Sequence, residues 1–166
     1  MARYYAFRGE YQKALEQAKQ TLTLQVDPVP LHLTMYQIYK ELGQEDSSFQ
    51  YFLQWRSAFG EEVEVMEANY REFGWQRAAE KMLILLEEKS ESNYIDPLHL
   101  ALYAVHAEDF DKAMDYLEQA YDQKVPLLTS IGLETHWKPL FSNQRFKRLL
   151  SKMELSPAWA KFGGFY

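Results

Sequence analysis

The residues best suited to chemistry are the histidines, because an imidazole can bind a metal or transfer a proton near neutral pH. His99 and His106 stand seven residues apart on one expected helix. A zinc site needs three or four ligands, and its closest pair is usually three or four residues apart. Glu134 and His136 would act as an acid/base pair only in a cleft that perturbs the carboxylate. We expect instead a solvated loop with Trp137 anchored in the core, and the sequence predicts no metal, no cofactor and no catalytic residue.

Composition and motifs argue against three further kinds of site. The chain has no cysteine, which excludes disulfides and thiolate chemistry. Gly163 and Gly164 form an isolated pair, without the preceding strand and following helix of a phosphate-binding loop. The formal net charge of −6 at pH 7 disfavours direct binding of nucleic acid. Basic residues are in excess over 138–161, and we interpret them as a solvated helix face.

The length of 166 residues, with 47% hydrophobic side chains, suits one well-packed domain. Its longest apolar runs, such as Met82–Leu86, are only a few residues long, which is too short to span a bilayer. No signal-like apolar segment follows Met1. We therefore expect a cytoplasmic protein that does not bind a membrane.

A repeat runs through the chain, marked by one small residue in each copy. These residues follow one another at intervals of 34, 31 and 34 positions, and they are Ala14, Ser48, Ala79 and Ala113. Each stands five positions after a turn residue. The turn residues are Gly9, Gly43, Gly74 and Glu108. Glycine suits this place because the chain takes a left-handed conformation where a helix ends, so Glu108 leaves the geometry of the last turn open.

The repeat predicts an all-α protein in which each copy is a helical hairpin. Four positions before the turn residues stand Tyr5, Tyr39, Tyr70 and Ala104, of which three are aromatic. The expected hairpins cover about 1–26, 29–59, 61–90 and 95–123, and a capping helix that begins at Ser142 or Asn143 covers about 142–154. In the second copy an aromatic stripe is expected in the core. It consists of Met35, Tyr36, Tyr39, Phe52, Trp55 and Phe59.

The last hairpin resembles a tetratricopeptide repeat. In that family small residues recur at the eighth, twentieth and twenty-seventh positions of a repeat of about 34, and here they are Ala101, Ala113 and Ala120. The resemblance implies a right-handed α-solenoid of about four hairpins that holds protein partners, over a single domain of residues 1–166. Glu67 departs from the pattern, since a small residue is expected there, and the first copy has only half of its first helix. We interpret the incomplete first helix as a sign that the chain is cut from a longer protein.

The end of the chain is similar to the C-terminal repeat region of bacterial signalling and transcription-regulatory proteins. That region ends in Pro-Leu, Asp-Pro-Arg-Phe and Leu-Leu, each separated by two residues. This chain has Pro139–Leu140, Arg145–Phe146 and Leu149–Leu150 at the same spacing, with Asn143 and Gln144 in place of Asp-Pro. The resemblance implies a regulatory role beside an effector domain. Between the last hairpin and the cap, we expect a short helix over 127–132 and an ordered loop over 134–141.

In a solenoid of this kind the first helix of each hairpin lines the concave side, where partners usually bind. The register gives a groove that is basic at its upstream end and apolar downstream, suited to a peptide with an acidic end and an apolar anchor. Its predicted residues are Arg3, Gln37, Lys40, Arg71, Leu98, Leu102, Val105 and His106. Two alternatives stay open: the groove is filled by the chain's own aromatic tail from Trp159 to Tyr166, or the protein forms a homodimer through aromatic residues such as Trp159 and Phe162.

Overall fold

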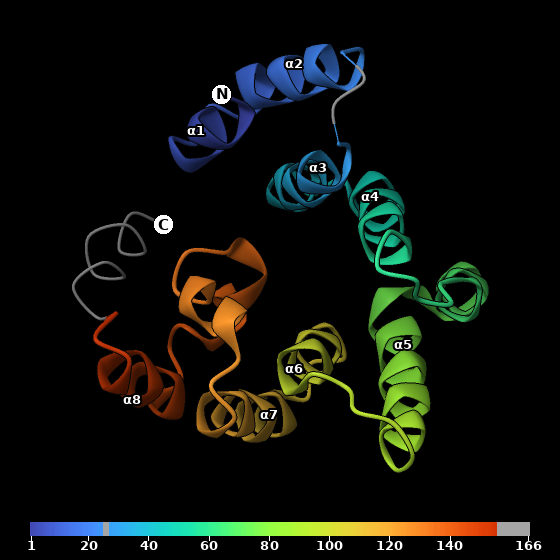
Figure 1. The fold of residues 1–166 in the computed structure, drawn as a ribbon. Coiled ribbons are helices and arrows are strands. Elements are labelled where there is room, and N and C mark those ends of the chain that lie inside the picture. The colour runs from blue at the N-terminus through green and yellow to red at the C-terminus, as the bar shows by residue number, and fades with distance from the viewer. Residues whose placement is uncertain (25–26, 156–166) are drawn as a thin grey trace. The chain divides into compact units, whose positions relative to one another are not determined.

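The computed structural model describes residues 1–24 and 27–155, which form helices joined by short turns (Figure 1). These residues contain no strand, so the prediction of an all-α protein is confirmed for them. The α-helices are α1 (Ala2–Phe7), α2 (Tyr11–Leu22), α3 (Val29–Glu41), α4 (Glu45–Ser57), α5 (Glu64–Ser90), α6 (Pro97–His106), α7 (Phe110–Asp122) and α8 (Gln144–Lys152). Two 3-10 helices, η1 (Pro126–Ser130) and η2 (Thr135–Leu140), lie between α7 and α8.

The chain divides into two compact units. Unit 1 is Met1–Glu67, and unit 2 is Ala68–Tyr166, of which residues 68–155 are described. In unit 1, α1 packs against α2 and α3 packs against α4; in unit 2, α6 packs against α7. The prediction of one continuous domain over 1–166, arranged as a solenoid, stays a prediction.

The turns inside the hairpins repeat one hydrogen-bond pattern. Gly9, Gly43 and Glu108 have left-handed backbones, with φ of 71°, 66° and 62°. The next residue along the chain then donates its N–H to the carbonyl five positions earlier, which satisfies an end group of the first helix. These bonds are Glu10 to Tyr5 at 3.0 Å, Gln44 to Tyr39 at 2.9 Å and Asp109 to Ala104 at 3.0 Å. The last turn thus keeps the geometry of the other two, although a glutamate occupies it.

The small residue of each repeat copy lies in the second helix of its hairpin and is buried. Ala14, Ser48, Ala79 and Ala113 are all fully buried, each with 0% exposure. The Ser48 hydroxyl donates to the Tyr36 carbonyl at 3.0 Å, so this buried polar group is satisfied. A larger side chain at these positions would hold the two helices of a hairpin apart.

Side-chain caps begin three helices of unit 2. The carboxylate of Asp96 accepts from the Leu98 amide at 2.8 Å, and that of Asp109 accepts from the Lys112 amide at 3.1 Å. Asn143 caps α8 by accepting from the amide of Arg145 at 2.8 Å. Such caps stabilise a helix by about 1 kcal/mol. The predicted start of the last helix is confirmed at Asn143, which performs this role without the proline of the resembling family.

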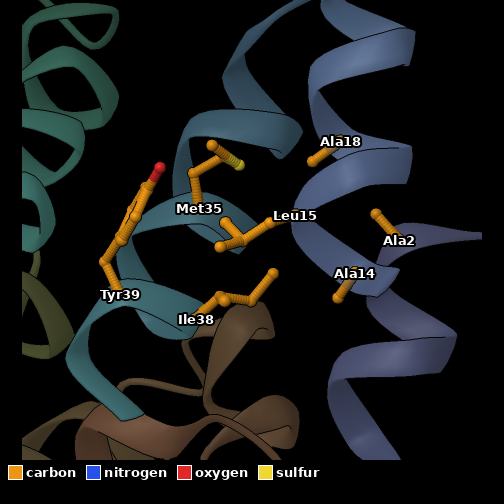
Figure 2. Packing of buried hydrophobic residues seen from close by; sticks show 7 residues of the cluster. All are labelled: Ala2, Ala14, Leu15, Ala18, Met35, Ile38 and Tyr39. Carbon is orange, nitrogen blue, oxygen red and sulfur yellow. The ribbon is translucent and has the colours of Figure 1, made fainter. Parts of the chain in front are cut away.

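One buried hydrophobic cluster of unit 1 lies between α2 and α3, with α1 at its side. Figure 2 shows Leu15 of α2 pointing toward Met35 and Ile38 of α3. Ala14 and Ala18 are fully buried on α2, where their small size allows close approach. The buried members of this cluster are Ala2, Ala14, Leu15, Ala18, Met35, Ile38 and Tyr39.

The predicted aromatic core of the second copy is wrong at one position. Tyr36 and Phe52 are fully buried, and their rings meet edge to face with centroids 5.2 Å apart. Phe59, in contrast, is 62% exposed. It lies beyond the end of α4 at Ser57, so the helical spacing that predicted its burial no longer applies there.

Helix α5 is broken at Gly74, whose φ of 79° and ψ of −179° are not helical. Trp75 follows the break, and its ring stacks on that of His106 in α6 at 5.0 Å. Further along α5, Glu87 accepts from the Tyr116 hydroxyl of α7 at 2.5 Å and pairs with the Lys112 ammonium at 3.0 Å. Burial and the Glu87 carboxylate raise the pKa of Tyr116 well above its ordinary value. These contacts fix α5 against α6 and α7.

The segment from 134 to 141, which was predicted to be an ordered loop, contains the 3-10 helix η2. A 3-10 helix has three residues per turn, so a search for the α-helical period does not find it. Trp137 and Leu140, three residues apart, are 2% and 0% exposed. The expected anchoring of Trp137 in the core is confirmed, and η2 packs against α6.

Candidate partner-binding face

The turns give α3 and α6 the same register, so their surfaces can be compared position by position. Six and three positions before the turn residue stand Gln37 and Lys40 in α3, and Leu102 and Val105 in α6. Ten positions before it stand Leu33 and Leu98. Residues at this spacing share one side of a helix. We call Leu33, Gln37 and Lys40 the α3 face, and Leu98, Leu102 and Val105 the α6 face.

The α6 face is closed within unit 2. Leu102 is 4% exposed, Val105 is 3% exposed and His106 is 7% exposed. The helix packs against α7 and against η2. Its residues are buried except for Leu98 and His99, which are half-buried. A partner could not reach Leu102, Val105 or His106 without displacing part of unit 2. Their predicted place in a groove is therefore corrected: these side chains form part of the core.

The α3 face is more exposed. Leu33, Gln37 and Lys40 are all half-buried. The Lys40 ammonium lies 6.0 Å from the centroid of the Tyr36 ring, within the range of a cation–π interaction. The Nε2 atom of Gln37 is enclosed and has no hydrogen-bond partner. An enclosed donor that lacks an acceptor costs free energy, so this amide is a strained feature of the α3 face.

Arg3 occupies in α1 the position that Gln37 occupies in α3, six residues before the turn. It is exposed, and α1 packs against α3. The structure therefore places Arg3 in one unit with Gln37 and Lys40, and a groove lined by them stays a prediction. Sequence reasoning missed Leu33, which lies one helical turn before Gln37 and would have been found by extending the same register.

The other two predicted residues belong to unit 2. Arg71 lies in α5 before the break at Gly74 and is exposed. Leu98 is half-buried at the start of α6, where its amide is bound by Asp96.

A histidine–carboxylate pair lies in the segment around η2. His136 Nε2 is 3.2 Å from an oxygen of Glu134, and the histidine side chain is 2% exposed. Because the imidazole is enclosed, a substrate has no access to it, and the contact serves to hold η2. The residues described also contain no group of three or more His, Cys, Asp or Glu side chains that could bind a metal ion.

A second polar contact of unit 2 joins acidic residues of α7 to a basic residue of α8. The guanidinium of Arg145 donates to the Glu118 carboxylate at 2.8 and 3.1 Å and to Asp115 at 2.6 Å. These bonds lower the pKa of Glu118 and raise the pKa of Arg145. The contact attaches α8 to α7 and does not involve the α6 face.

Comparison of the chain with protein-family models, with curated proteins and with solved structures gives no match. In the part of the chain that the structure describes, each helix is too short or too polar to cross a membrane. The resemblance to tetratricopeptide repeats therefore stays a prediction, and the geometry of the chain itself must support any function.

Proposed function

We propose that the chain is a protein-binding module of the tetratricopeptide type. It would form a right-handed solenoid of about four hairpins with α8 as the cap. Its role would be the partner-binding or regulatory part of a larger cytoplasmic protein of bacterial signalling or transcription regulation, without a reaction of its own. The repeated turn pattern at Gly9, Gly43 and Glu108 supports the repeat, and the resemblance of the C-terminal segment supports the setting.

The observation that carries the proposal is the polar, half-buried α3 face. The inner side of a first helix that served packing alone would be apolar, as it is in α6, where Leu102 and Val105 are buried. The α3 face instead presents an amide and an ammonium at the same positions. Because Leu33, Gln37 and Lys40 are only half-buried, a partner could contact part of this face.

Affinity capture from a lysate of the source organism tests the proposal. The wild-type chain is compared with Lys40→Glu on the α3 face and with the matched control Lys19→Glu, which makes the same charge change at an exposed position of α2. We expect at least one protein to be retained by the wild type and by Lys19→Glu and lost from Lys40→Glu. Identical captures by all three chains would contradict a role of this face.

Self-association is the second candidate, because unit 1 exposes large aromatic side chains. Tyr4 is 54% exposed and Phe59 is 62% exposed. The tail residues Trp159 and Phe162, named above as dimer contacts, lie outside the described residues, as does the tail predicted to fill the groove. Light scattering over a hundredfold range of concentration distinguishes the candidates. A mass that rises with concentration in the wild type and not in Phe59→Ser favours a homodimer, and a constant monomer mass excludes it.

A further inference from the structure

Helix α5 has one side that is buried in the fold and one side that is exposed. Its buried side includes Ala78, Ala79 and Met82. The exposed side carries two large apolar side chains, since Phe73 is 56% exposed and Ile84 is 42% exposed. Single exposed apolar residues are normal on a protein surface, so the residues between these two decide whether they form a contact surface.

Four residues of the exposed side follow one another at intervals of four, three and four positions. They are Phe73, Arg77, Glu80 and Ile84, which we call the α5 seam. This spacing is that of the contact positions of a coiled coil. The seam has an apolar residue at each end and two opposite charges in the middle. Polar residues at such positions set the register and direction of helix pairs.

A surface pocket lies at one end of the seam. It has a volume of about 380 Å³ and is lined by Phe73, Gln76, Arg77 and Glu80. Although α5 is broken at Gly74, the pocket shows that the Phe73 side chain lies beside those of Arg77 and Glu80. In a coiled coil, four residues at these relative positions form the hole that receives a side chain of the facing helix.

The charges of the seam distinguish the two directions in which a second α5 could lie. Arg77 and Glu80 pair within one helix, and their side chains are 57% and 42% exposed. In a parallel two-fold pair each charge would face its own copy, and like charges would repel. In an antiparallel pair centred midway along the seam, Arg77 of each copy faces Glu80 of the other. Phe73 then faces Ile84 in the same way.

We propose that a second copy of this chain docks on the α5 seam, with the two α5 helices antiparallel. Ile84 of the second copy packs on the Phe73 ring, and Glu80 of the second copy enters the pocket beside Arg77. A guanidinium has five N–H donors, so Arg77 can bind both carboxylates. The contact lies in unit 2 and therefore does not depend on the α3 face or on the exposed aromatic residues of unit 1.

Sedimentation equilibrium of the full chain tests the inference over about 1 to 500 µM, because a contact made by one helix from each copy is expected to be weak. We expect the mass to rise from the 19.7 kDa of one chain toward twice that value. Ile84→Ser removes both apolar contacts and should raise the dissociation constant at least about tenfold. The matched control Leu127→Ser, at an exposed residue of unit 2 outside the seam, should stay within about twofold of the wild type.

Charge reversal tests the direction of the pair. Arg77→Glu or Glu80→Arg alone places like charges opposite each other and should raise the dissociation constant at least about tenfold. The double variant Arg77→Glu/Glu80→Arg restores opposite charges in the antiparallel pair, so its constant should return to within about threefold of the wild type. An equimolar mixture of the two single variants should form a heterodimer, although each variant associates only weakly with itself.

A mass that stays at that of one chain over the whole range would overturn the inference. So would a dimer that Ile84→Ser and Arg77→Glu leave unchanged, or one that the double variant fails to restore. A dimer lost in Phe59→Ser and retained in Ile84→Ser would instead place the contact at the aromatic residues of unit 1. Circular dichroism verifies the helices of each variant, and the substituted side chains of the seam are all exposed.

Discussion

Two helices in the same register, α3 in unit 1 and α6 in unit 2, have opposite surroundings. Gln37 and Lys40 of α3 are half-buried, while Leu102 and Val105 of α6 are nearly inaccessible. The turns that end these helices have the same hydrogen bonds and left-handed residues, at Gly43 and Glu108. The hairpin geometry therefore does not decide whether the inner side of the first helix is open. In unit 2, α6 packs against α7 and η2.

The composition of each face agrees with its surroundings. Burial stabilises an apolar helix face by about 25 cal/mol for each Å² that is removed from water, so the α6 face is stabilised by its burial in unit 2. Similar burial of an ammonium such as that of Lys40 would cost free energy unless a counter-charge came with it. In the function proposed above, α6 would serve stability and α3 would serve binding.

The largest expected effect comes from a charge placed on the closed face. Leu102→Glu should lower the free energy of unfolding of unit 2 by about 3–5 kcal/mol, because the carboxylate would be enclosed without a partner. The matched substitution Gln37→Glu in α3 should change stability by about 1 kcal/mol or less, since that side chain is half-buried and lies near Lys40. Urea unfolding followed by circular dichroism measures both.

This pair of substitutions tests whether the α6 face is closed and the α3 face is open. If Leu102→Glu kept its helicity and stability, the α6 face would be open to solvent, and the groove predicted from the register would be restored along both helices. If Gln37→Glu were as destabilising as Leu102→Glu, the α3 face would be closed as well. Unit 1 would then offer no binding surface at this position.

The sequence predicted the helices and turns well because local physics determines them. The spacing of Ala14, Ser48, Ala79 and Ala113 identified positions that are all fully buried. The pattern also identified the turn residues, and even the departure at Glu108 takes a left-handed backbone. At this turn the hydrogen bond from the Asp109 amide to the Ala104 carbonyl imposes a left-handed backbone. Glu108 adopts this conformation at a small cost in free energy.

The candidate site was predicted less well, since burial depends on contacts that are distant in sequence. Nothing in the register of α6 shows that η2 (Thr135–Leu140) returns to pack on it. One signal was present: the sequence of α6 from Leu100 to Val105 is apolar on every side, which is typical of an enclosed helix. The 3-10 helix that covers it has a period of three residues, which conceals it from a search for α-helices.

The second prediction concerns the turns after α3 and α6, which have the same geometry in the two units. Glu108→Gly should stabilise unit 2 by about 0.5–1 kcal/mol, because glycine takes the left-handed conformation without steric cost. Gly43→Ala should destabilise unit 1 by about 1 kcal/mol for the same reason, although no atom would contact the added Cβ within 4 Å. Thermal unfolding of both variants gives the signs. A loss of stability in Glu108→Gly would mean that the glutamate side chain makes a stabilising contact that outweighs the strain.

The smallest expected effect tests whether the cap α8 is held by charge. Arg145→Met removes the bonds to Glu118 and Asp115, and it should cost about 1 kcal/mol or less near neutral pH, because the pair is partly exposed and screened by water. Arg148→Met is the control on the same helix, where the arginine is exposed. Urea unfolding at several pH values measures both variants against the wild type.

The pH dependence of this effect has a definite sign. The Arg145 guanidinium lowers the pKa of Glu118 in the folded chain below its ordinary value of 4.5. A carboxylate with a lowered pKa stabilises the fold above the pKa of the unfolded chain, and this contribution disappears as the pH falls through the folded pKa. The difference between the wild type and Arg145→Met should therefore be constant from about pH 6 to 8 and vanish in acid. A difference that persisted below about pH 3 would show that Arg145 acts through packing of its aliphatic stem on α7 and that charge contributes little.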